Sequence, residues 1–181
     1  GADDVDRVVF TPLSADGLPL ASPPALAHAS LPGTGAALAT SQVGDGRAYL
    51  AFGTSKSRSD IWLRDATVTA TDARGAFLGS NGEIDHSPVL AVGEGGGAVL
   101  WYRVRSGIRN DVLIQRFADD GTTITVVGNA RVLNDTSSDE EGAPGVYGPA
   151  LTRVSDDVYF AAWSEGPSPD FRLVGRFVRF E

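Results

Sequence analysis

The feature that most constrains this chain is a recurring pair of short apolar runs joined by turn-forming residues. The second runs of three such pairs begin at Ala48, Ala98 and Val158, which are 50 and then 60 residues apart. Glycine, aspartate and serine stand between the two runs of each pair, and these residues favour tight turns. Two apolar segments joined by such a turn are typical of a β-hairpin. We therefore expect three hairpins in series, made of residues 37–39 with 48–52, 89–91 with 98–102, and 150–152 with 158–163.

Each hairpin is followed by a polar stretch, an aspartate and a further β-rich run. The aspartates are Asp60, Asp111 and Asp170. A repeated aspartate at the start of a strand caps backbone amides of the turn or pairs with a nearby arginine; the alternative is a ring of equivalent ligand sites. Turn formers and a fourth strand follow the first two of these runs, and the amino-terminal residues fit the last part of the same pattern. The sequence predicts one domain with repeat units at about 6–34, 35–86, 87–147 and 148–181.

Four short antiparallel strands in each 45–60 residues form the pattern of a β-propeller blade. From about Asp6 to Phe180 the chain resembles the propeller repeats of bacterial extracellular proteins, through the hairpins that follow Gly46, Gly97 and Asp157. The resemblance implies an all-β, propeller-like fold with about three four-stranded antiparallel blades plus an extra strand. A β-sandwich of similar length is the alternative. Neither the Trp-Asp pair of WD40 repeats nor the Asp-box of sialidases is present, so no functional residue is carried over from those families.

The charge and composition exclude several classes of partner and site. The net charge is −8 and the isoelectric point is about 4.7, so phosphates of nucleic acid and of anionic membranes would repel the surface. No apolar run approaches the roughly 18–20 residues that cross a bilayer, and membrane insertion is not expected. Cysteine is absent, which removes disulfides, thiolate zinc sites and cysteine nucleophiles. With the resemblance, these properties predict a bacterial protein that is secreted, periplasmic or exposed at the cell surface.

Residues 83–87 hold the densest mixture of acid–base groups in the sequence. Glu83, Asp85 and His86 are candidate ligand-binding residues, since carboxylates and imidazole transfer protons and bind ligands. Strand alternation places Glu83, Asp85 and Ser87 on one face and His86 on the other. The alternative is a solvated turn between two repeat units.

The segment 134–142 is acidic and rich in oxygen ligands. Calcium prefers such ligands, and the candidate metal ligands are Asp135, Asp139, Glu140 and Glu141. The segment lacks the EF-hand spacing, and a hydrated loop is the alternative. No other cofactor is expected.

The chain contains three tryptophans, Trp62, Trp101 and Trp163. Their rings are candidate platforms on which a sugar could stack. The alternative is that they pack between sheets, which is the commoner role of a large aromatic side chain.

No nucleophile elbow, phosphate-binding loop or dinucleotide fingerprint occurs in the sequence. This absence favours a non-catalytic protein without excluding an enzyme, because catalytic residues are often distant in sequence. About three blades are fewer than a closed propeller needs. We therefore expect an interaction module that binds a protein partner or its own copy through a propeller-like surface. The alternative is a carbohydrate-binding or carbohydrate-active protein, with a glycan as its ligand.

Overall fold

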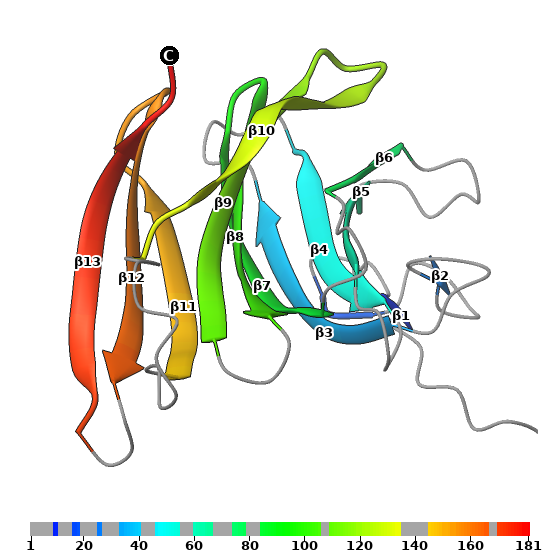
Figure 1. Cartoon of the computed structure of the whole chain (residues 1–181). Helices are drawn as coiled ribbons and strands as arrows, with labels where there is room; N and C mark the ends of the chain where they lie inside the picture. Colours follow the sequence, from blue (N-terminus) through cyan, green and yellow to red (C-terminus); the bar gives the residue numbers. More distant parts are fainter. Residues whose placement is uncertain are drawn as a thin grey trace, which may run out of the picture.

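The chain forms β-sheets throughout the part that the structure describes. This computed structural model describes residues 9–10, 16–18, 25–26, 33–40, 46–54, 60–66, 74–78, 84–105, 109–134, 145–166 and 170–181. Every regular element within these residues is a strand, and all paired strands are antiparallel (Figure 1). The predicted all-β class is confirmed. None of the described residues belongs to a helix long and apolar enough to cross a membrane.

Three meanders, in which each strand pairs with the next one in the chain, account for most of the strands. The first sheet contains β3 (Gly33–Thr40), β4 (Ala48–Thr54), β5 (Asp60–Asp65) and β6 (Gly75–Phe77). The second sheet contains β7 (Ile84–Gly93), β8 (Gly96–Arg105), β9 (Arg109–Asp119) and β10 (Ile124–Val132). The third sheet contains β11 (Gly145–Arg153), β12 (Val158–Gly166) and β13 (Arg172–Arg179). The short strands β1 (Val9–Phe10) and β2 (Ala25–Leu26) pair with each other.

The three predicted hairpins are confirmed as β3–β4, β7–β8 and β11–β12. In the second of them, Glu94 and Gly95 form a two-residue turn between Gly93 and Gly96. Gly95 has a φ of 71° and Gly96 a φ of 139°, values that glycine adopts without steric cost. The amino-terminal pattern predicts strands at residues 7–10 and 18–20 with a turn at 15–17 between them. The structure differs, because β1 pairs with residues 25–26 and Leu18 is exposed and outside the strands.

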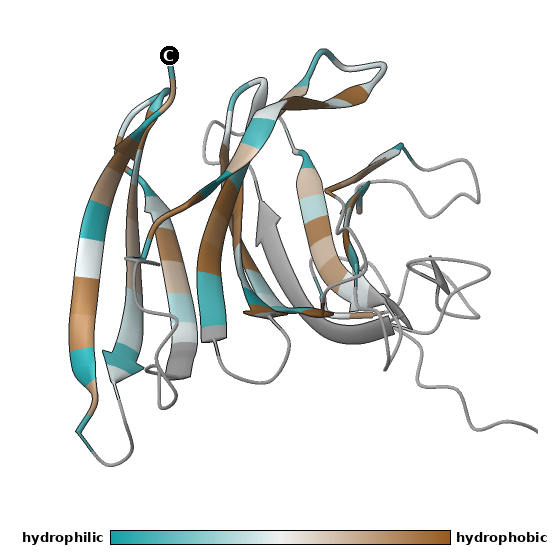
Figure 2. Ribbon diagram, in the orientation of Figure 1, coloured by the Kyte–Doolittle hydropathy of each residue, from teal (hydrophilic) through white to brown (hydrophobic). Residues whose placement is uncertain are grey.

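The sheets stack face to face with the second sheet in the middle (Figure 1). One apolar cluster fills the space between the first and second sheets and includes Tyr49, Ile61 and Trp101. Another lies between the second and third sheets and includes Ile114 and Trp163. The middle strands β8 and β9 of the second sheet are therefore buried on both faces, and Figure 2 shows the resulting apolar stretch along β9. A smaller cluster that includes Leu50 and Phe52 lies on the other face of the first sheet.

The first strands of the three meanders, β3, β7 and β11, lie next to one another in space. Each contains a register shift near its beginning, at Thr34/Ala36, His86/Val89 and Tyr147/Ala150. An extra residue at such a bulge bends the strand and increases its twist. Within the described residues the sheets do not close into a ring, and a sandwich-like all-β arrangement fits them. The boundaries of the four predicted repeat units stay predictions.

Candidate functional site

The predicted acid–base segment is divided by the fold. Glu83 lies outside the described residues. Asp85 is fully buried and accepts hydrogen bonds from Arg103, with 2.8 Å from Nε to Oδ1 and 3.1 Å from Nη2 to Oδ2. Burial raises the pKa of Asp85, and the Arg103 guanidinium opposes this rise. The carboxylate of Asp85 thus forms a cross-strand ion pair between β7 and β8.

His86 and Ser87 lie together on the opposite side of β7. His86 faces Tyr102 of β8 with ring centroids 5.7 Å apart, and Ser87 Oγ donates a hydrogen bond to the Tyr102 hydroxyl over 3.2 Å. The prediction that Ser87 shares a face with Asp85 is wrong. The register shift after His86 interrupts the alternation, and Ser87 has a φ of 48°, a left-handed conformation that is rare for residues other than glycine.

Two of the three tryptophans are inside the molecule. Trp101 and Trp163 are 0% and 1% exposed, and the Trp163 indole N–H donates to Glu165 Oε2 over 2.9 Å. Neither buried ring presents a face to a sugar in this structure. Trp62 is half-buried and packs on Phe77 with centroids 5.2 Å apart.

The predicted calcium ligands Asp135, Asp139, Glu140 and Glu141 lie outside the described residues. Among the residues that are described, no group of three or more histidine, aspartate or glutamate side chains is arranged to hold a metal ion. Calcium binding by the 134–142 segment stays a prediction.

The recurrent aspartates do not occupy equivalent positions in all three sheets. Asp60 begins β5, and Asp111 of β9 is buried and stands opposite Arg103 in the register. Asp170 is exposed and precedes β13. In the third sheet the charges are reversed, since Glu165 of β12 stands opposite Arg172 of β13. The Arg172 Nη2 to Glu165 Oε1 distance is 2.6 Å.

An ion-pair network that sequence reasoning missed joins the first and second sheets. Asp119, at the end of β9, has a side chain with no exposed surface and contacts Arg47 Nη1 at 3.0 Å. Arg74 contacts both Asp119 and Asp65. Two arginines and two aspartates balance one another, so this network holds the sheets together and leaves no charge for a ligand.

The outer face of the third sheet is apolar and uncovered within the described residues. Leu173 and Phe177 of β13 are 80% and 71% exposed, and Phe160 of β12 packs on Phe177 with centroids 5.0 Å apart. β13 pairs only with β12 among the described strands. Sequence reasoning missed this face because β13 carries apolar residues on both sides, so its pattern does not show which side is covered.

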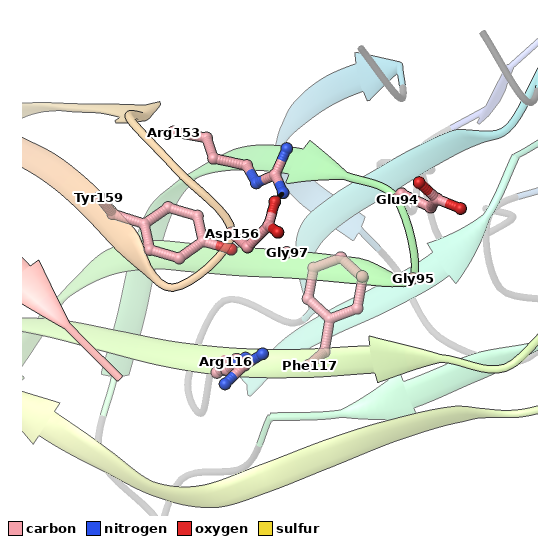
Figure 3. A pocket seen from close by; sticks show the side chains of 9 residues that line it. Glu94, Gly95, Gly97, Arg116, Phe117, Arg153, Asp156 and Tyr159 are labelled. Carbon is pink, nitrogen blue, oxygen red and sulfur yellow. Dashed lines mark hydrogen bonds and ion pairs between the residues drawn. The ribbon is translucent and has the colours of Figure 1, made fainter. Parts of the chain in front are cut away.

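A small polar pocket opens between the second and third sheets (Figure 3). It offers about 20 Å³ to water-sized molecules. The residues that line it come from the β7–β8 turn, from β9 and from the β11–β12 hairpin: Glu94, Gly95, Gly96, Gly97, Arg116, Phe117, Arg153, Asp156 and Tyr159. Its chemistry is set by two guanidinium groups, one phenol and two carboxylates.

Comparison of the chain with protein-family models, with curated proteins and with solved structures finds no match.

Proposed function

We propose that this protein is a non-catalytic interaction module of the propeller type that associates with a second copy of its own chain through the outer face of the third sheet. The observation that carries the proposal is the uncovered apolar face formed by Leu173, Phe177 and Phe160.

A comparison of two register positions supports this assignment. Two residues after Trp101, Arg103 stands opposite Asp111 of the next strand. Two residues after Trp163, Glu165 stands opposite Arg172 of the next strand in the same way. The residues that follow these partners, Val112 and Leu173, are therefore equivalent. Val112 is 0% exposed because the third sheet covers it, whereas Leu173 is 80% exposed. The third sheet thus carries the kind of face that another sheet covers in the middle of the molecule.

The energy of covering this face is consistent with association. Burying a leucine or phenylalanine side chain contributes about 1.5–3 kcal/mol. Lost freedom of motion opposes association by at least about 4 kcal/mol. Burial of Leu173 and Phe177 together offsets an association cost at the lower end of that range. If the cost is higher, burial of Phe160 and of the edge of β13 must offset the rest.

The distribution of charge along β13 favours a second copy as the occupant. Asp170 is exposed just before the strand, and Arg179 is exposed at its end, where its Nε lies 3.8 Å from Asp157 Oδ2 of the same chain. Two third sheets packed face to face with their β13 strands antiparallel place Asp170 of each copy near Arg179 of the other. Such an interface uses the same patch on both copies and closes as a dimer.

The arrangement of the meanders supports the propeller type. Three antiparallel meanders stack in chain order, and their first strands β3, β7 and β11 lie side by side, as the inner strands of propeller blades do. On the corresponding outer face of the first sheet Phe52 is 1% exposed and Phe77 is 45% exposed, so this face leaves less apolar surface uncovered than the third sheet does. A dimer is therefore expected to form through the third sheet alone.

Light scattering coupled to size exclusion tests the proposal. We expect the measured mass of the unmodified chain to rise with protein concentration from 18.9 kDa towards twice that value. The double variant Leu173→Ser, Phe177→Ser should remain at the mass of one chain. The matched control Val127→Ser changes a side chain of β10 that is 38% exposed and should dimerise normally. A single-chain mass at every concentration, or a dimer that survives the double variant, would overturn the proposal.

A further inference from the structure

We propose that the pocket between the second and third sheets binds a carboxylate group, held by the guanidinium groups of Arg116 and Arg153. This inference does not depend on the association proposed above, because the pocket lies on the covered side of the third sheet.

The first support is a guanidinium group of the pocket that has no carboxylate partner. Arg116 of β9 makes no ion pair with any residue that the structure describes. Arg153 pairs with Asp156, whose side chain is 96% exposed to solvent, so water competes for that carboxylate. Glu94 makes no ion pair with the described residues and points away from both arginines in Figure 3. One guanidinium is thus left without a carboxylate of its own.

The second support is a buried hydroxyl beside the two arginines. Tyr159 is 1% exposed and lines the pocket, and its side chain lies beside Arg153 and Asp156 (Figure 3). Burial raises the pKa of Tyr159, and the charges of Arg153 and Arg116 act against that rise. The phenol therefore keeps its proton at neutral pH and is available as a donor. Two guanidinium groups and a phenol are donors that suit an anionic oxygen.

The backbone beside the pocket allows Arg153 to take its position. A Cβ atom at Gly93 would lie 2.1 Å from Arg153 Nη1, so the guanidinium rests directly against the Gly93 backbone and a side chain there would displace it. Gly95, Gly96 and Gly97 follow in the same turn and place no side chain over the opening. The rim of the pocket is consequently low on this side.

The size of the pocket selects among anions. Its space of about 20 Å³ exceeds the roughly 10–15 Å³ that one water needs. A planar carboxylate end is smaller than a tetrahedral phosphate or sulfate, so we expect the site to prefer a carboxylate. The remainder of the ligand stays outside, so the carboxylate can belong to a small organic acid or to a peptide.

An NMR titration of the full chain with acetate, at constant ionic strength set with chloride, tests the site. We expect saturable shifts of the Gly95–Gly97 amide signals. Binding should weaken by about tenfold or more in Arg116→Gln, since each charge-assisted hydrogen bond contributes about 1.5–3 kcal/mol. The control Arg176→Gln changes an exposed arginine of β13 that does not line the pocket and should bind acetate normally.

Two further arms identify the source of the carboxylate. A pentapeptide with a free carboxyl terminus and no acidic side chain is compared with its amidated form. Tighter binding of the free peptide than of acetate assigns the site to polypeptide carboxylates, and acetate binding without peptide binding assigns it to small acids. No saturable shift with acetate, equal binding in Arg116→Gln, or equal binding of sulfate would overturn the proposal.

Discussion

The Tyr49 hydroxyl donates a hydrogen bond of 2.8 Å to Asp119 Oδ2, and this bond joins the first sheet to the second. The two residues are 70 positions apart in the sequence. Tyr49 also packs its ring on Phe117, with centroids 5.4 Å apart, so one side chain contributes to both the apolar core and the ion-pair network. Contacts of this kind make the stacked sheets depend on a small number of polar groups.

Replacing Asp119 with asparagine should lower the free energy of unfolding at neutral pH by about 3 kcal/mol. Removing one partner of a buried ion pair leaves the other charge without full compensation. Here Arg47 and Arg74 both lose their contact with Asp119, although Arg74 keeps its contact with Asp65. Urea denaturation of the variant measures the change. Glu181→Gln, at an exposed position, should change stability by less than about 0.5 kcal/mol. An equal effect of both substitutions would contradict the role given to Asp119.

Because of the Asp119 carboxylate, we also expect the free energy of unfolding to fall at acidic pH. Burial acts to raise the pKa of Asp119, but hydrogen bonds from Arg74, the Gly121 N–H and Tyr49 outweigh it and hold the pKa below its usual value. A depressed pKa stabilises the fold above the unfolded-state value of about 4, and this stabilisation is lost as the pH falls through the folded-state pKa. Denaturation midpoints between pH 6 and pH 2 should therefore fall more steeply for the unmodified chain than for Asp119→Asn.

A second dependence is expected in alkali. Burial, followed by the hydrogen bond to Asp119, raises the pKa of Tyr49 to about 12. The unfolded chain releases this proton near pH 10, so the folded state loses up to about 2 kcal/mol of stability between pH 10 and pH 12. Tyr49→Phe should remove this alkaline loss while lowering stability at pH 7. Thermal unfolding of the unmodified chain and of Tyr49→Phe across that pH range measures this difference. An equal loss of stability in the two proteins would contradict the role given to the Tyr49 hydroxyl.

The ion pair of Glu165 and Arg172 is expected to be energetically asymmetric. The Arg172 side chain is 76% exposed, and Arg172→Gln should cost no more than about 1 kcal/mol. Glu165→Ala should cost more, about 1–3 kcal/mol, because it leaves the buried Trp163 indole N–H without an acceptor. Guanidinium denaturation followed by tryptophan fluorescence compares them. A larger loss of unfolding free energy in Arg172→Gln than in Glu165→Ala would contradict this prediction.

Gly148 should tolerate asparagine better than alanine. Its φ is 59°, and a Cβ atom there would meet nothing within 4 Å, so the cost of a substitution comes from the backbone alone. Alanine in the left-handed region costs about 1–2 kcal/mol, whereas asparagine visits that region more readily. Thermal melts of Gly148→Ala and Gly148→Asn test this order, and equal melting temperatures would show that the bulge adjusts its backbone.

Apolar alternation and turn residues in the sequence predicted the hairpin strands well. The runs that begin at Ala48, Ala98 and Val158 became the second strands of three hairpins, because alternation and turn residues act over a few positions. The polar sites were not predictable in this way. Alternation failed at Ser87, where the bulge adds a residue, and the Asp119 network draws on four segments that no spacing rule connects.

The sequence by itself determined an all-β chain of antiparallel hairpins, because turn chemistry and apolar alternation are properties of neighbouring residues. Only the tertiary structure decided which faces became core. Val112 and Leu173 are both apolar residues on strands, yet one is covered and the other exposed. Burial depends on which sheet lies opposite, and that is settled by the stacking of distant segments. The pocket of Arg116, Arg153 and Tyr159 arises for the same reason, since its donors meet only when the second and third sheets pack.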